Sequence, residues 1–139
     1  LELGVCNMFK FLLPLAGLIV FSFTNVTHAA EVSEIKYIHL TPAFVVNYGN
    51  TGRMKYLRTE IALKVNGASA AGAVTSHRPY IRNNLVFLLT AQDGDIVNSS
   101  AGRETLRKVA LDEVRALMTE LEGEPMVDDL YFENFVVQN

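Results

Sequence analysis

The sequence predicts an α+β fold, with an antiparallel sheet of about three strands covered on one face by two helices. Three observations support it. Residues 55–65 alternate between apolar and polar side chains, two later stretches have helical apolar spacing, and residues 129–138 are rich in β-branched and aromatic side chains. The expected order is strand, strand, helix, helix, strand, preceded by an apolar N-terminal helix or signal peptide.

The first two strands are expected to form a long antiparallel hairpin. Residues 34–46 form a strand with a break at Thr41–Pro42, because proline cannot donate to a sheet ladder. Residues 47–53 have the glycine- and asparagine-rich composition of a turn. The second strand is expected to have one buried and one wet face, the buried one carrying Leu57, Thr59, Ile61, Leu63 and Val65.

Residues 66–75 are rich in glycine, alanine and serine and are interpreted as a flexible loop. Pro79 then marks the first turn of a helix, where a missing N–H costs nothing. The apolar face of this first helix carries Ile81, Leu85, Leu88 and Leu89. We expect this helix to end at residues 92–95.

The second helix is expected to be longer. Ser99 or Ser100 can cap its start, and Gly123 followed by Pro125 is expected to end it. The closing strand loses its alternation near Asn134, which predicts a β-bulge.

The N-terminus has the pattern of an export signal. Met8 is the expected true start, and an apolar run over residues 11–23 follows one lysine. Thr27 and Ala29 are small residues suited to a cleavage site. Residues 1–29 are thus a cleaved signal peptide or an uncleaved membrane anchor. The apolar run is shorter than the roughly 20 residues of a spanning helix, which favours the signal.

Composition limits the function. Half of the 139 residues are hydrophobic, so residues 31–139 can bury a core. The net charge of −3 gives no electrostatic reason to expect nucleic acid as a partner. The single cysteine, Cys6, excludes an internal disulfide and a cysteine-built metal site.

The sequence offers no recognisable catalytic, metal-binding or cofactor-binding residues. His28 lies in the expected N-terminal signal, and His39 and His77 are not in a metal-ligand spacing. There is no nucleophile elbow and no phosphate-binding glycine loop. An acidic run at residues 120–124 is a solvated face or a docking patch.

The arginines are better candidates for binding. Arg82, Arg103, Arg107 and Arg115 lie in the predicted helices. Arginine is enriched at protein interfaces, because its planar fork binds carboxylates in a bidentate manner. The alternative is that each serves only solubility or helix pairing.

Five segments in the right order resemble the FliL family of flagellar basal-body proteins. Within residues 35–138 they are a first strand with a proline–phenylalanine–asparagine pattern, a second strand, two helix starts and a closing strand, at residues 37–47, 53–65, 78–83, 102–107 and 130–138. Pro79 and Arg82 match the start of the family's first helix.

The resemblance implies a non-enzymatic protein with a stomatin/prohibitin-like periplasmic domain over residues 31–139. Family members associate with flagellar stator and basal-body proteins, form rings, and support torque and motility. No cofactor and no nucleic acid is implied. Pro79, Arg82, Arg103 and Arg107 are the residues that we expect to contact a partner or a second copy.

The N-terminus departs from the family pattern, which has a short cytoplasmic tail and an uncleaved membrane helix. The protein is therefore expected in the periplasm, either soluble after cleavage or anchored in the inner membrane at the basal body. A soluble periplasmic scaffold or binding module unrelated to motility is the main alternative. An exported enzyme using His39 or His77 with nearby carboxylates is a third.

Overall fold

The computed structural model describes residues 34–49 and 52–138, which lie in the second of two units of the chain, Glu31–Asn139. The expected signal or anchor over residues 1–29, with its start at Met8, falls outside the described residues. Within the described ranges, no helix is both long enough and apolar enough to cross a membrane.

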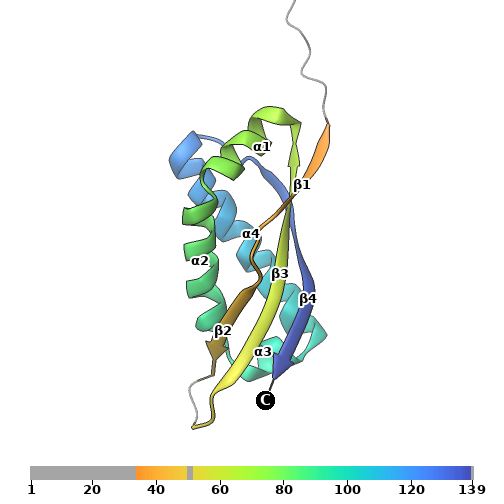
Figure 1. Ribbon diagram of the computed structural model, residues 1–139, viewed down its shortest axis with the longest axis vertical. Helices are drawn as coiled ribbons and strands as arrows, with labels where there is room; N and C mark the ends of the chain where they lie inside the picture. The colour runs from red at the N-terminus through yellow and green to blue at the C-terminus, as the bar shows by residue number, and fades with distance from the viewer. Residues whose placement is uncertain (1–33, 50–51, 139) are drawn as a thin grey trace, which may run out of the picture. The chain divides into compact units, whose positions relative to one another are not determined.

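The expected α+β architecture is confirmed (Figure 1). The sheet is antiparallel and is built around one long strand, β3, which pairs with β1 and β2 along one edge and with β4 along the other. The strands are β1 (Ile35–His39), β2 (Phe44–Tyr48), β3 (Lys55–Asn66) and β4 (Val127–Gln138). Because β1 and β2 follow each other along the same edge, they act as one strand with a break, as predicted at Thr41–Pro42.

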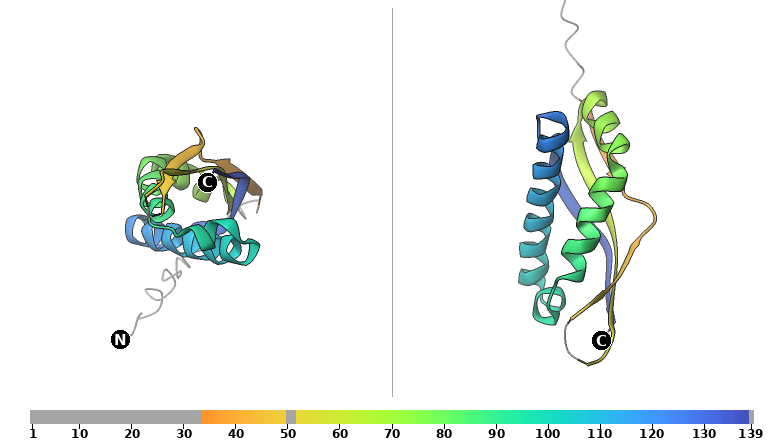
Figure 2. Two further views of the ribbon diagram at one scale, coloured as in Figure 1. Left: turned by 90° about the horizontal axis from the view of Figure 1, so that it is seen from below. Right: turned by 90° about the vertical axis from the view of Figure 1, so that its left-hand side faces the viewer.

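The helices lie together on one face of the sheet (Figures 1 and 2). They are α1 (Gly67–Ser76), α2 (Arg78–Thr90), α3 (Gly94–Asn98) and α4 (Ser100–Glu122). The predicted buried face of β3 is confirmed, since Leu57, Thr59, Ile61, Leu63 and Val65 all pack inward with almost no exposure. The opposite face of the sheet carries exposed Tyr37, Val45 and Val136.

The expectation of a loop over residues 66–75 is wrong, because this segment forms helix α1. Four of its ten residues are alanine, the best helix former, and this outweighs its two glycines. Gly67 makes the turn out of β3 with a positive φ of 87°, and Ala70 and Val74 are buried. Small side chains therefore serve here for close packing rather than for flexibility. The short helix α3 was not predicted either.

The predicted ends of the long helix and the bulge are confirmed. Ser99 caps α4 by accepting a hydrogen bond from the Gly102 N–H at 3.0 Å, and Gly123 ends the helix with a φ of 81°. Asn134 has a φ of 48°, and the register slips so that two residues of β4 oppose Thr59. The buried Thr59 hydroxyl donates to the Glu133 carbonyl at this bulge.

Gly102 is predicted to be essential for the contact between α3 and α4. A Cβ atom there would lie 2.3 Å from the Ile96 carbonyl oxygen, so Gly102→Ala must push the two helices apart. We expect a loss of about 1–3 kcal/mol in the free energy of unfolding, measured by urea denaturation.

Gly72→Ala is the matched control, because a Cβ there meets nothing within 4 Å in helix α1. It should leave the protein equally stable or raise the unfolding free energy by about 0.5–1 kcal/mol. Equal stability of the two variants would contradict the proposed close approach at Gly102.

Candidate contact surface along helix α4 and strand β4

One flank of α4 carries a row of side chains directed at β4. Arg103, Arg107, Leu111 and Arg115 follow one another at intervals of four residues, so they lie one turn apart along the helix. Leu111 is buried, and the three arginines are half-buried. The flank therefore combines an apolar anchor with three guanidinium groups.

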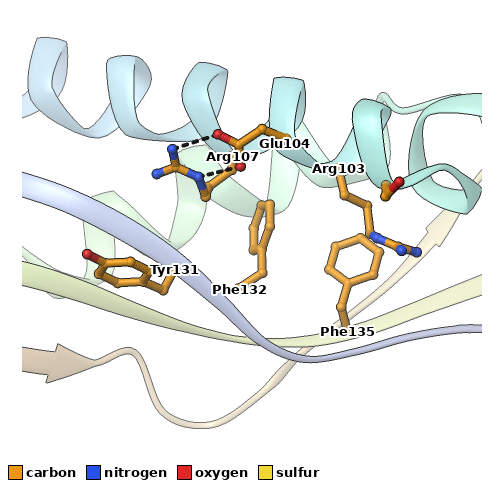
Figure 3. Close-up of a pocket in the computed structure, with 7 residues that line it drawn as sticks. Arg103, Glu104, Arg107, Tyr131, Phe132 and Phe135 are labelled. Carbon is orange, nitrogen blue, oxygen red and sulfur yellow. Dashed lines mark hydrogen bonds and ion pairs between the residues drawn. The ribbon is translucent and has the colours of Figure 1, made fainter.

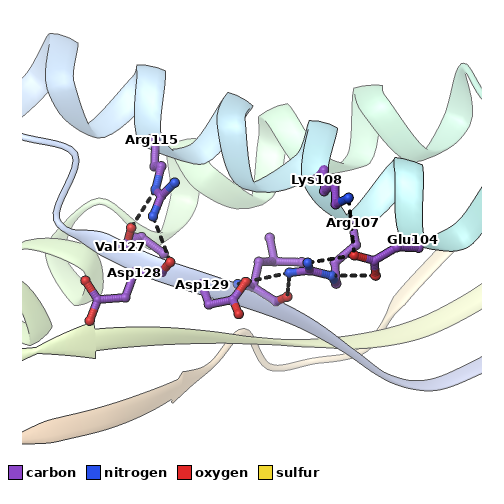
Figure 4. Close-up of polar contacts among 8 residues, drawn as sticks. Glu104, Arg107, Lys108, Arg115, Val127, Asp128 and Asp129 are labelled. Carbon is purple, nitrogen blue, oxygen red and sulfur yellow. Dashed lines mark hydrogen bonds and ion pairs between the residues drawn. The ribbon is translucent and has the colours of Figure 1, made fainter.

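Two of these arginines bind backbone carbonyls at the start of β4 (Figure 4). Arg115 donates from Nε to the Val127 oxygen at 2.8 Å and from Nη2 to the Asp128 oxygen at 2.7 Å. Arg107 donates from Nη1 to the Leu130 oxygen at 3.1 Å. Both arginines therefore tie helix α4 to the backbone of β4 near its start.

Arg107 is also the centre of a charge cluster. Its Nε and Nη2 atoms donate to the two carboxylate oxygens of Glu104, each at 2.8 Å, in a bidentate pair. Its Nη1 atom donates to Asp129 Oδ1 at 2.5 Å. Glu104 also forms a long ion pair with Lys108, at 3.9 Å. Arg107 therefore links one turn of α4 to the start of β4.

The cluster shifts the pKa values of its members. The hydrogen bond from Arg107 holds the pKa of Glu104 below its usual value. Partial burial would raise the pKa of Asp129, but hydrogen bonds from the Leu130 N–H, Tyr131 and Arg107 outweigh it and lower that pKa. The pKa of Arg107 is raised, chiefly by its hydrogen bond to Glu104, so it stays charged.

A pocket of about 270 Å³ opens between α4 and β4 beside this cluster (Figure 3). Phe132 and Phe135 stack at a tilt with ring centroids 5.3 Å apart. The Arg103 guanidinium carbon lies 5.6 Å from the Phe135 ring centroid, within cation–π range. The full lining is Ser100, Arg103, Glu104, Arg107, Tyr131, Phe132 and Phe135.

Arg103 differs from its neighbours in how little it is bound. Its side chain donates from Nη1 to the Val97 oxygen over a long distance of 3.4 Å. A guanidinium has five N–H donors, so Arg103 keeps capacity for a carboxylate from outside the chain. Sequence reasoning singled out Arg103 and Arg107, and the structure brings both to this pocket. Sequence reasoning did not identify Phe132, Phe135 or Asp129, because the sequence indicates only that they belong to the closing strand.

The other two predicted contact residues, Pro79 and Arg82, lie elsewhere, on α2. Pro79 is exposed in the first turn of the helix. Arg82 donates from Nη1 to the Leu40 and Pro42 oxygens, both at 2.7 Å. Its guanidinium carbon also lies 4.2 Å from the Phe44 ring centroid. Arg82 therefore binds the break between β1 and β2, where the peptide between Thr41 and Pro42 is cis.

The two described histidines each contact a carboxylate. His39 Nδ1 lies 3.2 Å from Glu133 Oε2 on the open sheet face, and His77 Nε2 lies 2.5 Å from Glu122 Oε1, where α1 meets α2. His39 also borders a hollow of about 270 Å³. Each contact joins two elements distant in sequence. Among residues 34–49 and 52–138, no group of three potential ligands could hold a metal ion.

Comparison with known proteins agrees with the resemblance seen in the sequence. The family model described as "Flagellar basal body-associated protein FliL" matches residues 37–138, which run from β1 to the end of β4. The chain belongs to the FliL family. It is also similar to "Flagellar protein FliL" of Aquifex aeolicus (strain VF5), with 26% identity over 99 residues. That match covers 71% of this chain but 59% of the relative, so the chain spans less than two thirds of that FliL protein's length.

The charge cluster predicts a specific pH dependence of stability. Because the pKa values of Glu104 and Asp129 are lower in the folded state, their contribution is present above their unfolded values and is lost as pH falls through the folded ones. We expect Arg107→Gln to lower the free energy of unfolding by about 1–2 kcal/mol at neutral pH. The deficit should shrink near pH 3, as urea denaturation at both pH values would measure.

Lys108→Gln is the matched control, because Lys108 is mostly exposed and contacts Glu104 only at 3.9 Å. Its loss should stay below about 0.5 kcal/mol at either pH, as for most exposed pairs. An Arg107→Gln deficit that is equally large at both pH values would show that the lost hydrogen bond to the Leu130 carbonyl, and not the bonds to the carboxylates, dominates.

Proposed function

We propose that this chain is a non-enzymatic accessory protein of the bacterial flagellar motor, which associates with the basal body and its stator units and supports torque and motility. The observation that carries the proposal is the FliL family match, which spans the sheet and the helices together rather than a local motif. Association by contact also suits the domain, because its surface carries the sparsely bonded guanidinium of Arg103, the exposed ring of Phe87 and the exposed carboxylate of Glu113.

The α4–β4 pocket is the part of the structure that best suits a partner. Arg103 has spare donors and lies beside Phe135, an arrangement of arginine and aromatic groups that is common at the centre of interfaces. Arg107 has its donors engaged by Glu104, Asp129 and Leu130, so it shapes the pocket wall. We assign Arg103 the direct contact and Arg107 the role of holding the pocket open.

Pro79 and Arg82, both on helix α2, complete the proposed set of contact residues. Pro79 is exposed and is available to a partner or to a second copy of the chain. Arg82 is half-buried, and this burial lowers the pKa of its guanidinium. The positive charge of the nearby Arg78 lowers the same pKa further. Its role in a contact would be indirect, through the position of the β1–β2 break.

The proposal places the domain in the periplasm, as a homo-oligomer of the ring type expected for the family. The two forms of the N-terminus remain alternatives within it: a soluble periplasmic protein after cleavage of residues 1–29, or a protein anchored in the inner membrane. Soluble scaffolding unrelated to motility is the alternative function, and the open sheet face with Tyr37 and Val45 would serve it equally well.

The first test is genetic. Deletion of the gene should reduce swimming in a medium of raised viscosity, where the motor works under load, and the wild-type gene should restore it. We expect Arg103→Glu to restore swimming poorly, because the reversed charge repels a carboxylate partner. Arg53→Glu is the control, since it makes the same charge change at an exposed residue in the turn before β3, and it should restore swimming. Undiminished swimming of the deletion strain under load, in the absence of a second family member, would refute the motor role.

A second test identifies the partners and the N-terminus together. The native protein should be crosslinked, isolated, and analysed by mass spectrometry. Recovery of stator subunits is expected under the proposal, and a first residue at Ala30 would show cleavage after Ala29. Reproducible recovery of the protein without any flagellar component would favour the scaffold.

A further inference from the structure

A second surface lies on the outer side of the helix layer, in the groove between α2 and α4. Figure 2 shows the two helices side by side. They run in opposite directions, since the His77–Glu122 contact joins the start of α2 to the end of α4. A shallow pocket of about 280 Å³ in the groove is lined by Asn84, Phe87, Leu88 and Glu113.

The α2 side of this groove exposes two aromatic rings. Tyr80 and Phe87 are 60% and 68% exposed, and seven residues separate them, so they lie on the same flank of the helix two turns apart. Val109 on α4 is 41% exposed. Large apolar side chains gathered on one surface mark a site of interaction more often than single exposed ones do.

The α4 side of the groove is acidic. Glu113 and Glu120 are also seven residues apart on one flank of α4, and both are exposed. Neither carboxylate forms a hydrogen bond or an ion pair with another residue of the described ranges. The arginines of α4 cannot neutralise them, because Arg107 and Arg115 lie on the β4 flank with their donors bound there.

We propose that this groove binds an amphipathic helix of a partner protein whose polar side is rich in lysine or arginine. An apolar stripe would pack against Tyr80 and Phe87, which lie about 10 Å apart along the helix axis. Basic residues at the same spacing would reach Glu113 and Glu120. The inference deepens the proposed function, because it names the chemistry of a partner, but it does not depend on which flagellar protein carries that helix.

A second copy of the chain is a poor occupant. Helix α1 has no charged residue, and the arginines of α4 lie against β4 or the α4–β4 pocket. In α2, Arg82 binds the β1–β2 break. Arg78, at the start of α2, is half-buried, and the exposed Lys108 of α4 pairs with Glu104. Within the described ranges, therefore, no helix carries a row of basic side chains along an exposed apolar stripe, which favours a different protein as the occupant.

The test uses the purified full chain and a defined probe. The probe is a fluorescent amphipathic peptide of leucine and lysine with helical spacing, and its counterpart replaces every lysine with glutamate. Fluorescence anisotropy should show binding of the lysine peptide alone, weakened by added salt. Phe87→Ser and Glu113→Lys should each raise its Kd at least about tenfold, or 1.4 kcal/mol.

Two matched variants outside the groove control for the chemistry of each change. Val136→Ser removes an exposed apolar side chain from the open sheet face, and Asp128→Lys reverses an exposed charge on β4. Both should bind the lysine peptide like the wild type, and circular dichroism should confirm that all four variants are folded. A photocrosslinking residue at Tyr80 should capture the peptide, whereas one at Tyr56 should not.

Equal binding of the two peptides, or an unchanged Kd for Glu113→Lys, would overturn the inference. Capture of the peptide at Tyr56 rather than Tyr80 would do so too. The outcome is separate from that of the motor role. If the deletion strain swims normally, the motor role fails but the groove inference still stands on peptide binding. If the strain has a motility defect but the protein does not bind the peptide, only the groove inference is refuted.

Discussion

Strand β3 sets the geometry of the whole domain, because it is paired along both edges. Its inward side chains from Leu57 to Val65 are buried, and its twelve residues span β1 and β2 on one side and β4 on the other. A strand paired on both edges cannot slip by one residue without moving its apolar set to the wet face. The positions of the helices, and of every site on them, follow from this register.

The edges of the sheet are completed by arginine side chains rather than by further strands. Arg82 binds the carbonyls of Leu40 and Pro42 at the break in one edge, and Arg115 binds those of Val127 and Asp128 on the other. In both places a helix supplies side-chain donors to backbone carbonyls of the sheet, and this helps to satisfy their need for hydrogen bonds. A guanidinium suits this task, because its donors spread over two carbonyls at once.

Much of the fold could be predicted from periodicity and caps. The alternation of β3, the Ser99 cap, the Gly123 stop and the bulge at Asn134 all depend on local chemistry that a sequence displays directly. Helix α1 could not be predicted in this way, because its glycines and serines suggest a loop unless the packing of Ala70 and Val74 is known. Local composition gives no information on that tertiary contact.

The sites were predictable only in part, for a related reason. Arginine content pointed to Arg103 and Arg107, but the difference between them depends on partners distant in sequence. Asp129 lies 22 residues from Arg107 and is brought to it only when β4 folds against α4. A spacing rule along one helix finds the Glu104–Arg107 pair. It cannot show that Arg107 donates four hydrogen bonds within the domain whereas Arg103 donates a single long one.

Helix α4 divides its charges between two flanks, and this division decides which surface remains available. On the β4 flank, Arg107 and Arg115 are bound to carboxylates and carbonyls of the chain itself, so little of their charge is left for a partner. On the α2 flank, Glu113 and Glu120 face solvent beside the exposed ring of Phe87. A charge already paired within a domain contributes shape and stability, whereas an unpaired one beside apolar surface contributes selectivity for the opposite charge. The same helix can therefore hold β4 through Arg107 and Arg115, keep Arg103 available at the α4–β4 pocket, and select a second partner through Glu113 and Glu120.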